Sequence, residues 1–168
     1  MSTEIWQRWK EVTVYVDSAK YGRLFRSSAP YYVNKDSDQK VDQAAVDVLT
    51  QRGIKRIISY NSISYTDAAK ALLTKAGITY LHLPVTDFQA PTLAQLKSTV
   101  TFRTQSPASS TLIHCGYGQG RTGTGVTAVQ LNVTNGANPP ESDWEDVNGV
   151  EEPAQMAVLR EFKKNPTA

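Results

Sequence analysis

Apolar and polar residues follow two periods along this chain, one typical of strands and one typical of helices. Short runs rich in β-branched residues predict strands at residues 12–16, 22–27, 54–60, 78–85 and 111–115. Amphipathic segments between these runs predict helices at residues 39–53, 64–77, 92–105, 121–135 and 153–164. Because strands and helices alternate, the pattern indicates an α/β fold.

Single residues mark several of the predicted boundaries. Gly53 and Gly77 are placed to end the first two helices, since glycine readily leaves the helical conformation. Thr92 is a candidate N-cap, and Pro153 suits the first turn of the last helix. The acidic segment at residues 141–149 is expected to be a loop.

Length and composition exclude several classes of protein. The chain has 168 residues, which predicts a single domain over residues 1–168. The formal net charge of only +2 does not suggest nucleic-acid binding. No apolar run is long enough to span a bilayer, and the start of the chain shows no secretory leader. We therefore expect a cytoplasmic protein, of the producing cell or of a host cell if it is a translocated effector.

Cysteine and histidine usage limits the redox and metal chemistry. One cysteine cannot form an internal disulfide, and no second cysteine is present to resolve a redox reaction. The two histidines and the cysteine lack zinc-ligand spacing, so no metal site is expected.

The informative motif is TLIHCGYGQGRTGT, at residues 111–124. An apolar strand runs into Cys115, and five residues later Arg121 stands at the start of a predicted helix. Three of the five intervening residues are glycines, which let successive backbone N–H groups point into one concavity. The helix N-terminus adds partial positive charge there. This combination predicts a binding site for a phosphate group.

The same surroundings favour chemistry at the cysteine. An anion-binding loop also stabilises a thiolate, which is the nucleophilic form of Cys115. Arg121 can hold two phosphate oxygens with its planar guanidinium group. Thr122 is placed to donate its hydroxyl to the sulfur, which helps the sulfur leave in a second step.

Two less specific readings were weighed against this one. A single cysteine in an apolar strand is usually a core residue, but the spacing to Arg121 and the glycines disfavour that reading. A glycine-rich loop before a helix can also bind a nucleotide. However, no Walker lysine follows, and the glycine pattern of a dinucleotide fold is missing.

The segment HCGYGQGRTG resembles the signature loop of the protein tyrosine phosphatase superfamily, and the length resembles its compact dual-specificity members. The resemblance implies a central, mostly parallel sheet flanked by helices, with the signature loop between a strand and a helix. It also implies that the loop binds the substrate phosphate through Gly116, Tyr117, Gly118, Gln119 and Gly120. Tyr117 departs from the pattern, since many members have a small residue there. Its ring either packs behind the loop or forms part of the rim.

Two further segments resemble the same family. YLHLPVTDFQAPT (80–92) is similar to the general-acid segment, and Asp87 is the matching position for the acid. GRLFRSSAP (22–30) is similar to a stretch near the start of compact members. We interpret Arg26 in that stretch as a structural ion-pair partner, and Trp6 and Trp9 as packing residues.

These observations predict a cysteine-dependent phosphatase that needs no cofactor. Its substrate is expected to be a phosphorylated protein or peptide, with phosphotyrosine first and phosphoserine or phosphothreonine also open. An inositol phosphate or phosphoinositide substrate, an inactive phosphate-binding module and a rhodanese-type sulfurtransferase are the alternatives. The intact set of Cys115, Arg121, Thr122 and Asp87 argues against an inactive module, and the Arg-Thr-Gly run disfavours the sulfurtransferase. The oligomeric state does not follow from the sequence.

Overall fold

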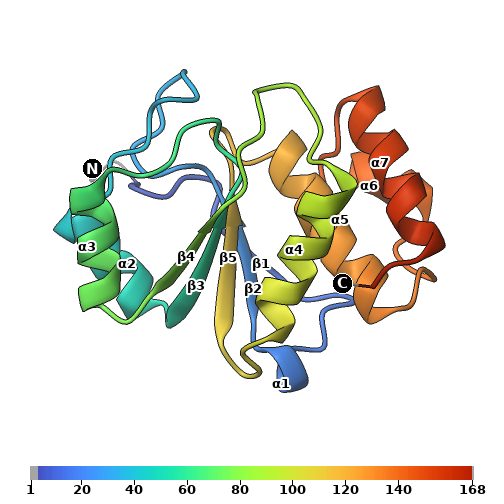
Figure 1. Cartoon of the computed structure of the whole chain (residues 1–168), viewed down its shortest axis with the longest axis horizontal. Coiled ribbons are helices and arrows are strands. Elements are labelled where there is room, and N and C mark those ends of the chain that lie inside the picture. The colour runs from blue at the N-terminus through green and yellow to red at the C-terminus, as the bar shows by residue number, and fades with distance from the viewer. Residues whose placement is uncertain (1–3, 168) are drawn as a thin grey trace.

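A computed structural model describes residues 4–167, which are built around one five-stranded sheet (Figure 1). The strands are β1 (Lys10–Val12), β2 (Leu24–Ser27), β3 (Ile54–Ser59), β4 (Thr79–His82) and β5 (Ser110–His114), in the order β1-β2-β5-β3-β4. Only β1 is antiparallel to its neighbour, and the other neighbouring strands are parallel. The expected α/β fold with a central, mostly parallel sheet is therefore confirmed.

Helices cover both faces of this sheet (Figure 1). They are α1 (Ser18–Tyr21), α2 (Gln43–Gln51), α3 (Asp67–Lys75), α4 (Leu93–Thr104), α5 (Gly120–Val133), α6 (Glu141–Asp146) and α7 (Pro153–Lys164). Helices α2 and α3 lie on one face, and α4 and α5 lie on the other with α7 packed outside them. None of the helices that the structure describes is both long and apolar enough to cross a membrane.

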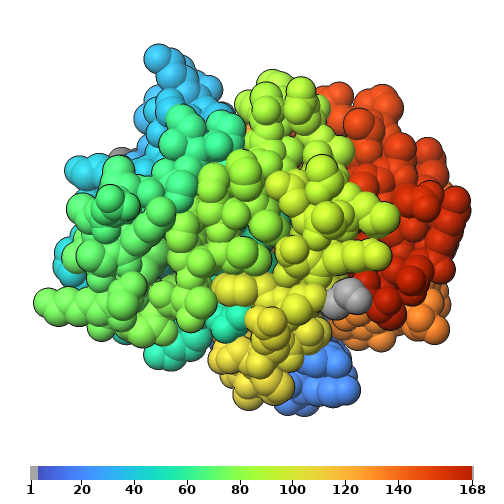
Figure 2. Space-filling model, viewed as in Figure 1, coloured from blue at the N-terminus to red at the C-terminus, as the bar shows by residue number. Residues whose placement is uncertain are grey.

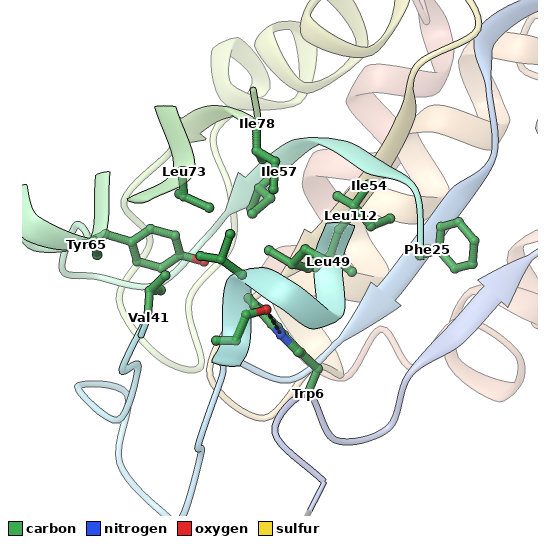
Figure 3. Packing of buried hydrophobic residues seen from close by; sticks show 13 residues of the cluster. Trp6, Phe25, Val41, Leu49, Ile54, Ile57, Tyr65, Leu73, Ile78 and Leu112 are labelled. Carbon is green, nitrogen blue, oxygen red and sulfur yellow. Dashed lines mark hydrogen bonds between the residues drawn. The ribbon is translucent and has the colours of Figure 1, made fainter. Parts of the chain in front are cut away.

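The central strand β5 contributes side chains to both faces, as the two-residue period of a strand requires. Leu112 packs into the cluster under α2 and α3, whereas Ile113 packs into the cluster under α5. Figure 3 shows the first cluster, in which Leu49 of α2 and Leu73 of α3 approach Ile57 of β3. Since parallel strands are covered on both sides, their sequences read as nearly continuous apolar runs.

Most predicted elements are found within a few residues of their expected bounds. Thr92 forms a capping box with Gln95 at the start of α4, and Pro153 is the first residue of α7. Gly53 and Gly77 follow α2 and α3 with φ angles of 74° and 73°, in the left-handed region that favours glycine.

The strand predicted at residues 12–16 is wrong beyond its first residue. Strand β1 ends at Val12, and the chain then turns towards α1. Tyr15 and Asp17 have φ angles of 56° and 49°, which an extended strand does not allow. The alternating valines produced the strand pattern, but Val14 is exposed rather than part of a sheet face.

The loop predicted at residues 141–149 is also wrong in its first part, which forms α6. Glu141 and Asp143 lie in the first turn, where negative charge stabilises the partial positive charge of a helix N-terminus. Trp144 is buried, and its indole N–H donates to the carbonyl of Pro139. Charge at a helix start and one buried aromatic residue thus give a short helix in a segment that reads as acidic and polar.

Helix α5 is buried on every side from Gly120 to Leu131 and depends on close contacts to its glycines. A Cβ on Gly123 would lie 2.1 Å from the carbonyl oxygen of Asn148, and one on Gly125 would lie 2.5 Å from the hydroxyl of Tyr60. These glycines therefore allow the neighbouring segments to approach the helix backbone.

The carboxyl ends of the parallel strands meet at one edge of the sheet, and four loops gather there (Figure 1). They are the loop after β5, the loop between β4 and α4, the loop between β3 and α3, and the long loop between β2 and α2. Figure 2 shows that the last of these, coloured light blue, projects beyond the neighbouring helices. In open α/β sheets this edge is where ligands bind.

The segment before β1 is part of the core. Trp6 is fully buried in the first cluster, and its indole N–H donates to the carbonyl of Ala45 at 3.1 Å (Figure 3). Trp9 packs on Phe25 with a ring distance of 5.3 Å. Both tryptophans pack as expected, although the segment is not helical.

We predict that Trp6→Ala lowers the free energy of unfolding by about 3–5 kcal/mol, because it leaves a large cavity in the core. A denaturant titration of both proteins measures the change. Val33→Ala is the control, since Val33 is 77% exposed and its truncation should change stability by about 0.5 kcal/mol or less. Equal stability of the two variants would contradict a core role for the first residues.

Candidate active site

The loop between β5 and α5 has the backbone shape that the sequence predicts. It runs from Cys115, directly after β5, to Gly120 at the start of α5. Gly118 has a φ angle of 98°, and a Cβ there would lie 2.5 Å from the carbonyl oxygen of Ser27. Any other residue would strain the backbone and collide with β2. The tight path of the loop therefore requires glycine at this position.

The sulfur of Cys115 accepts two hydrogen bonds. The backbone N–H of Gly118 lies 3.3 Å from Sγ, and the hydroxyl of Thr122 lies 3.0 Å from it. The residue is only 2% exposed and lies at the N-terminal end of α5. Both donors and the helix end favour negative charge on the sulfur.

His114 orders the backbone beside the cysteine. Its Nδ1 lies 2.9 Å from the carbonyl oxygen of Cys115, and its Nε2 is hydrogen bonded to the hydroxyl of Tyr65. Burial lowers the pKa of His114 to about 4, so the ring is neutral at physiological pH. A neutral ring fixes the end of β5 without adding a charge near the sulfur.

The guanidinium group of Arg121 is buried, and both of its terminal nitrogens donate two hydrogen bonds. Nη1 donates to the carbonyl oxygens of Tyr60 and Val85, at 3.2 and 2.8 Å. Nη2 donates to carboxylate oxygens of Asp36 and Asp87, at 2.7 and 3.1 Å. The plane of the group is thus fixed by residues at the ends of β3 and β4 and by two carboxylates.

Asp36 is a partner of Arg121 that the sequence does not predict. Its carboxylate also accepts hydrogen bonds from the backbone N–H and the hydroxyl of Ser62, and from the side-chain amide of Asn61. Burial by itself would raise the pKa of Asp36, but the bonds from Arg121 and Ser62 outweigh it and hold the pKa below its ordinary value. A lone Asp in a polar loop gives no sequence signal for this contact.

Asp87 binds the same nitrogen of Arg121, Nη2, as Asp36 does. Its side chain is 48% exposed, and it belongs to the loop between β4 and α4. The side-chain amide of Gln155 donates to the carbonyl of Gln89 at 3.1 Å, and that of Gln95 donates to the carbonyl of Pro84 at 2.9 Å. Bonds on both sides of Asp87 thus hold its loop over the site.

A small cavity of ≈ 20 Å³ joins these groups. It is lined by Asp87, Phe88, Cys115, Tyr117, Gln119, Gly120, Arg121, Glu151 and Gln155. Tyr117 is 48% exposed, so its ring forms part of the rim and does not pack behind the loop. Burial, followed by the nearby charges of Glu152 and Asp87, raises the pKa of Glu151.

Arg26 corrects the expectation of a structural ion pair. Its guanidinium group instead donates to backbone carbonyls of Gly118, Gln119 and Asn148, at 3.1, 3.3 and 2.7 Å. Burial lowers its pKa, and the nearby Cys115 partly opposes that shift. Arg26 therefore supports the back of the signature loop by holding its carbonyls away from the cavity.

The family comparison agrees with this geometry. A family model described as PTP-SAK, Swiss Army Knife protein, DSP-PTPase phosphatase domain, matches residues 22–168. The chain belongs to this family of DSP-PTPase phosphatase domains. The match begins after Tyr21, so the segment that carries Trp6 and Trp9 lies outside it. No curated protein matches the chain.

Solved structures share the DSP-PTPase fold. Tk-PTP in its active form is 24% identical over 88% of this chain and 97% of its own, with a TM-score of 0.64. PTPMT1 in complex with PI(5)P is 22% identical over 85% and 91%, with a TM-score of 0.65. A putative phosphatase (DUF442) from Shewanella putrefaciens CN-32 is 22% identical over 86% and 89%, with a TM-score of 0.62. At these identities the likeness concerns the fold.

The structure brings the four predicted side chains of the site together. Thr122 contacts the sulfur of Cys115, and Asp87 contacts Arg121. Of the predicted loop residues, Tyr117, Gln119 and Gly120 line the cavity, whereas Gly118 donates to the sulfur and Gly116 lies under Tyr32 and Asp36. Among the described residues no cluster of three or more His, Cys, Asp or Glu could hold a metal ion.

We predict that Asp36→Asn lowers kcat/KM for an aryl phosphate by about 10- to 100-fold, because small displacements of a positioned group cost that much. Asp36 accepts from Arg121 with one carboxylate oxygen and from Ser62 with the other. Asparagine has one side-chain oxygen and no charge, so it cannot keep both sets of bonds or the ion pair. Steady-state kinetics, with the inhibition constant of tungstate as a probe of oxyanion binding, measure the effect.

Asp38→Asn is the matched control. Asp38 lies on the same loop and accepts from the backbone N–H groups of Val33, Asn34 and Lys35, not from Arg121. The prediction would be contradicted if Asp36→Asn bound tungstate more tightly and turned over substrate as fast as the parent. Asp36 would then only reduce the affinity of Arg121 for anions and would not position it.

Proposed function

We propose that this protein is a phosphomonoester hydrolase that removes phosphate from phosphotyrosine in proteins or peptides, with phosphoserine and phosphothreonine as further substrates. The observation that carries the proposal is one cavity that joins the sulfur of Cys115, the guanidinium group of Arg121 and the carboxylate of Asp87. A nucleophile, an anion-binding group and an acid are the parts that phosphoryl transfer to a cysteine requires.

In the first step the thiolate of Cys115 attacks phosphorus and forms a S–P bond. The P–O bond to the leaving group breaks, and protonated Asp87 gives its proton to the departing oxygen. The backbone N–H groups of the signature loop and Arg121 stabilise the equatorial oxygens. The product alcohol leaves, and a phosphocysteine remains.

In the second step a water molecule attacks the phosphocysteine. Asp87, now a carboxylate, takes a proton from the water, and the S–P bond breaks to give phosphate and the thiolate. The hydroxyl of Thr122, 3.0 Å from the sulfur, stabilises the thiolate as it leaves.

Substrate binding must rearrange the contacts of Arg121. Asp87 and Asp36 both accept from Nη2, but Asp87 lines the cavity, whereas Asp36 lies outside its lining and is held by Asn61 and Ser62. A phosphate oxygen can therefore replace Asp87 on Arg121 while Asp36 stays. The displaced carboxyl group is then free to meet the leaving oxygen, so binding and acid placement are coupled.

The rim of the cavity favours an aromatic phosphate ester. Phe88 and Tyr117 line it and are 65% and 48% exposed, and the ring of Tyr32 stands 6.0 Å from that of Tyr117. Aromatic rings at the mouth can pack against a phosphotyrosyl ring. Phosphoserine and phosphothreonine offer no such ring and should be poorer substrates.

A phosphoinositide substrate is the second candidate, because the similar fold of PTPMT1 is found in complex with PI(5)P. The charges near the cavity disfavour this candidate. Asp36 and Asp87 pair with the buried Arg121, and Glu151 lines the same cavity. A ligand with several phosphates would bring much negative charge against these carboxyl groups.

We predict that Asp87→Asn slows the hydrolysis of substrates with poor leaving groups by about 100- to 10,000-fold. An aryl phosphate with a very acidic phenol should be affected much less, because its leaving oxygen needs little protonation. A series of aryl phosphates of rising phenol pKa measures the dependence. Equal losses along the series would move the acid role to another residue, and Glu151 is the group to test next.

We predict that phosphotyrosine peptides give a kcat/KM at least about ten times that for inositol polyphosphates, since the added phosphates are repelled by the carboxyl groups of Asp87 and Glu151 that line the cavity. Phosphate release from both substrate classes and from phosphoserine peptides, at one ionic strength, decides the substrate class. Cys115→Ser supplies the background, because a hydroxyl in place of the thiolate should abolish turnover while the fold survives. Preference for the inositol substrates would overturn the proposed function.

A further inference from the structure

A cation stands at the rim of the site on a segment outside the family match. Arg8 lies in the segment before β1, whereas the family model begins at residue 22. Its Nε donates to the carbonyl of Tyr117 at 2.7 Å, and its guanidinium carbon lies 3.7 Å from the centre of the Tyr117 ring. Arg8 is thus bound to the backbone and the side chain of the same signature-loop residue.

The segment that carries Arg8 is anchored on both sides. Trp6 forms a bridge to Pro30 and is buried beneath α2. Gln7 exchanges backbone and side-chain hydrogen bonds with Ser28, and its side-chain amide donates to the carbonyl of Tyr32. Arg8 itself has a φ angle of 53°, an uncommon conformation for a residue other than glycine. This backbone holds the Arg8 side chain against the loop.

The guanidinium group retains donors for a ligand. Nη1 makes one bond, of 3.3 Å, to the side-chain oxygen of Gln7. Among residues 4–167, Nη2 of Arg8 makes no hydrogen bond, and Arg8 forms no ion pair with a carboxylate. The group is exposed, and stacking on Tyr117 limits its rotation. A planar, oriented and unpaired guanidinium group is suited to bidentate contact with a carboxylate.

Tyr32 completes the surface between Arg8 and the cysteine. Its ring lies 5.8 Å from the guanidinium carbon of Arg8, and its Cε2 would lie 3.3 Å from a Cβ on Gly116, the residue after Cys115. We call Arg8, Tyr32 and Tyr117 the rim platform. A substrate that reaches from the sulfur across the platform meets first aromatic rings and then a cation.

The two sides of the mouth differ in charge. Glu151 lines the cavity next to α7, whereas Arg8 stands against Tyr117. Burial and then the charge of Asp87 raise the pKa of Tyr32, and Arg8 opposes them, so Asp87 also acts on the platform. An acidic residue next to the phosphotyrosine is therefore attracted to Arg8 and repelled by Asp87 and Glu151. A polyphosphate carries negative charge in several directions, so contact with Arg8 would leave its other phosphates close to the carboxyl groups of the cavity.

We infer that the rim platform is a specificity subsite for a carboxylate side chain next to the phosphotyrosine, so that the preferred substrates are acidic phosphopeptides. This inference rests on the proposed function and adds the sequence context of the substrate. Arg8 binds the Asp or Glu side chain of the peptide, and Tyr117 and Tyr32 pack against the phosphotyrosyl ring and the adjoining backbone. The segment before β1 thereby determines which phosphopeptides the active site prefers.

The test compares phosphotyrosine peptides that differ only in the residues flanking the phosphotyrosine, with Glu on the N-terminal side, Glu on the C-terminal side, or Gln on both. We expect one Glu peptide to exceed the Gln peptide in kcat/KM by about two- to five-fold, the upper part of the range for an exposed ion pair. The ratio should fall towards one near 1 M salt, where screening acts within about 3 Å. Equal rates for the three peptides would overturn the inference and leave the proposed function intact.

Variants then assign the preference to Arg8. Arg8→Gln should bring the Glu-to-Gln ratio to about one, and Arg8→Glu should reverse it in favour of a peptide with Lys at the same position. Arg52→Gln is the matched control, because Arg52 is an exposed arginine that stacks on Trp9 at 4.4 Å, away from the cavity. It removes the same charge and should keep the parental ratio.

Each outcome bears on the inference. Thermal melts identify a variant that fails to fold, and the parent's ratios and their salt dependence still test the platform in that case. If Arg52→Gln abolished the preference as Arg8→Gln does, the effect would come from net charge and the subsite would be wrong. If no peptide were turned over but inositol phosphates were, the proposed function would fail, and the subsite with it.

Discussion

The site depends on one buried guanidinium group. Arg121 joins the loop before α2 through Asp36, the end of β3 through Tyr60, and the loop between β4 and α4 through Val85 and Asp87. A buried cation without such partners would be very costly, so the loops around it are stable only in positions that satisfy it. The cation that we propose binds phosphate is therefore also the point around which the loops at the carboxyl edge of the sheet are arranged.

The signature loop is held from two sides by different means. Arg26 binds its outward carbonyls, and the inward N–H groups are thereby left to face the sulfur and the cavity. The negative groups nearby are divided in the same way. Asp36 is largely buried and fixed by Ser62, whereas Asp87 belongs to an exposed loop, although both accept from Nη2 of Arg121. Of the two carboxylates, only Asp87 lines the cavity.

The sequence predicted the sheet, most helices and the spacing of Cys115 and Arg121, because these follow from local periodicity and from one contiguous motif. It could not predict Asp36 or Arg8, since their partners lie 85 and 109 positions away and no local pattern marks either residue. The strand expected at residues 12–16 failed because alternation alone does not reveal a left-handed residue such as Tyr15. The loop expected at residues 141–149 failed because a single buried tryptophan outweighed a polar composition.

The glycines of α5 have a consequence for when the thiol becomes reactive. Neighbouring segments pack closely against Gly120, Gly123 and Gly125. Each glycine nevertheless destabilises an isolated helix by about 1 kcal/mol relative to alanine. Since helix nucleation is itself unfavourable, α5 should form only when β5, α4 and α7 are packed around it. The donors to Cys115 would then exist only in the complete fold, and a nascent or partly unfolded chain would carry an ordinary thiol. Hydrogen exchange of the α5 amides and alkylation of Cys115 should therefore report the same opening event.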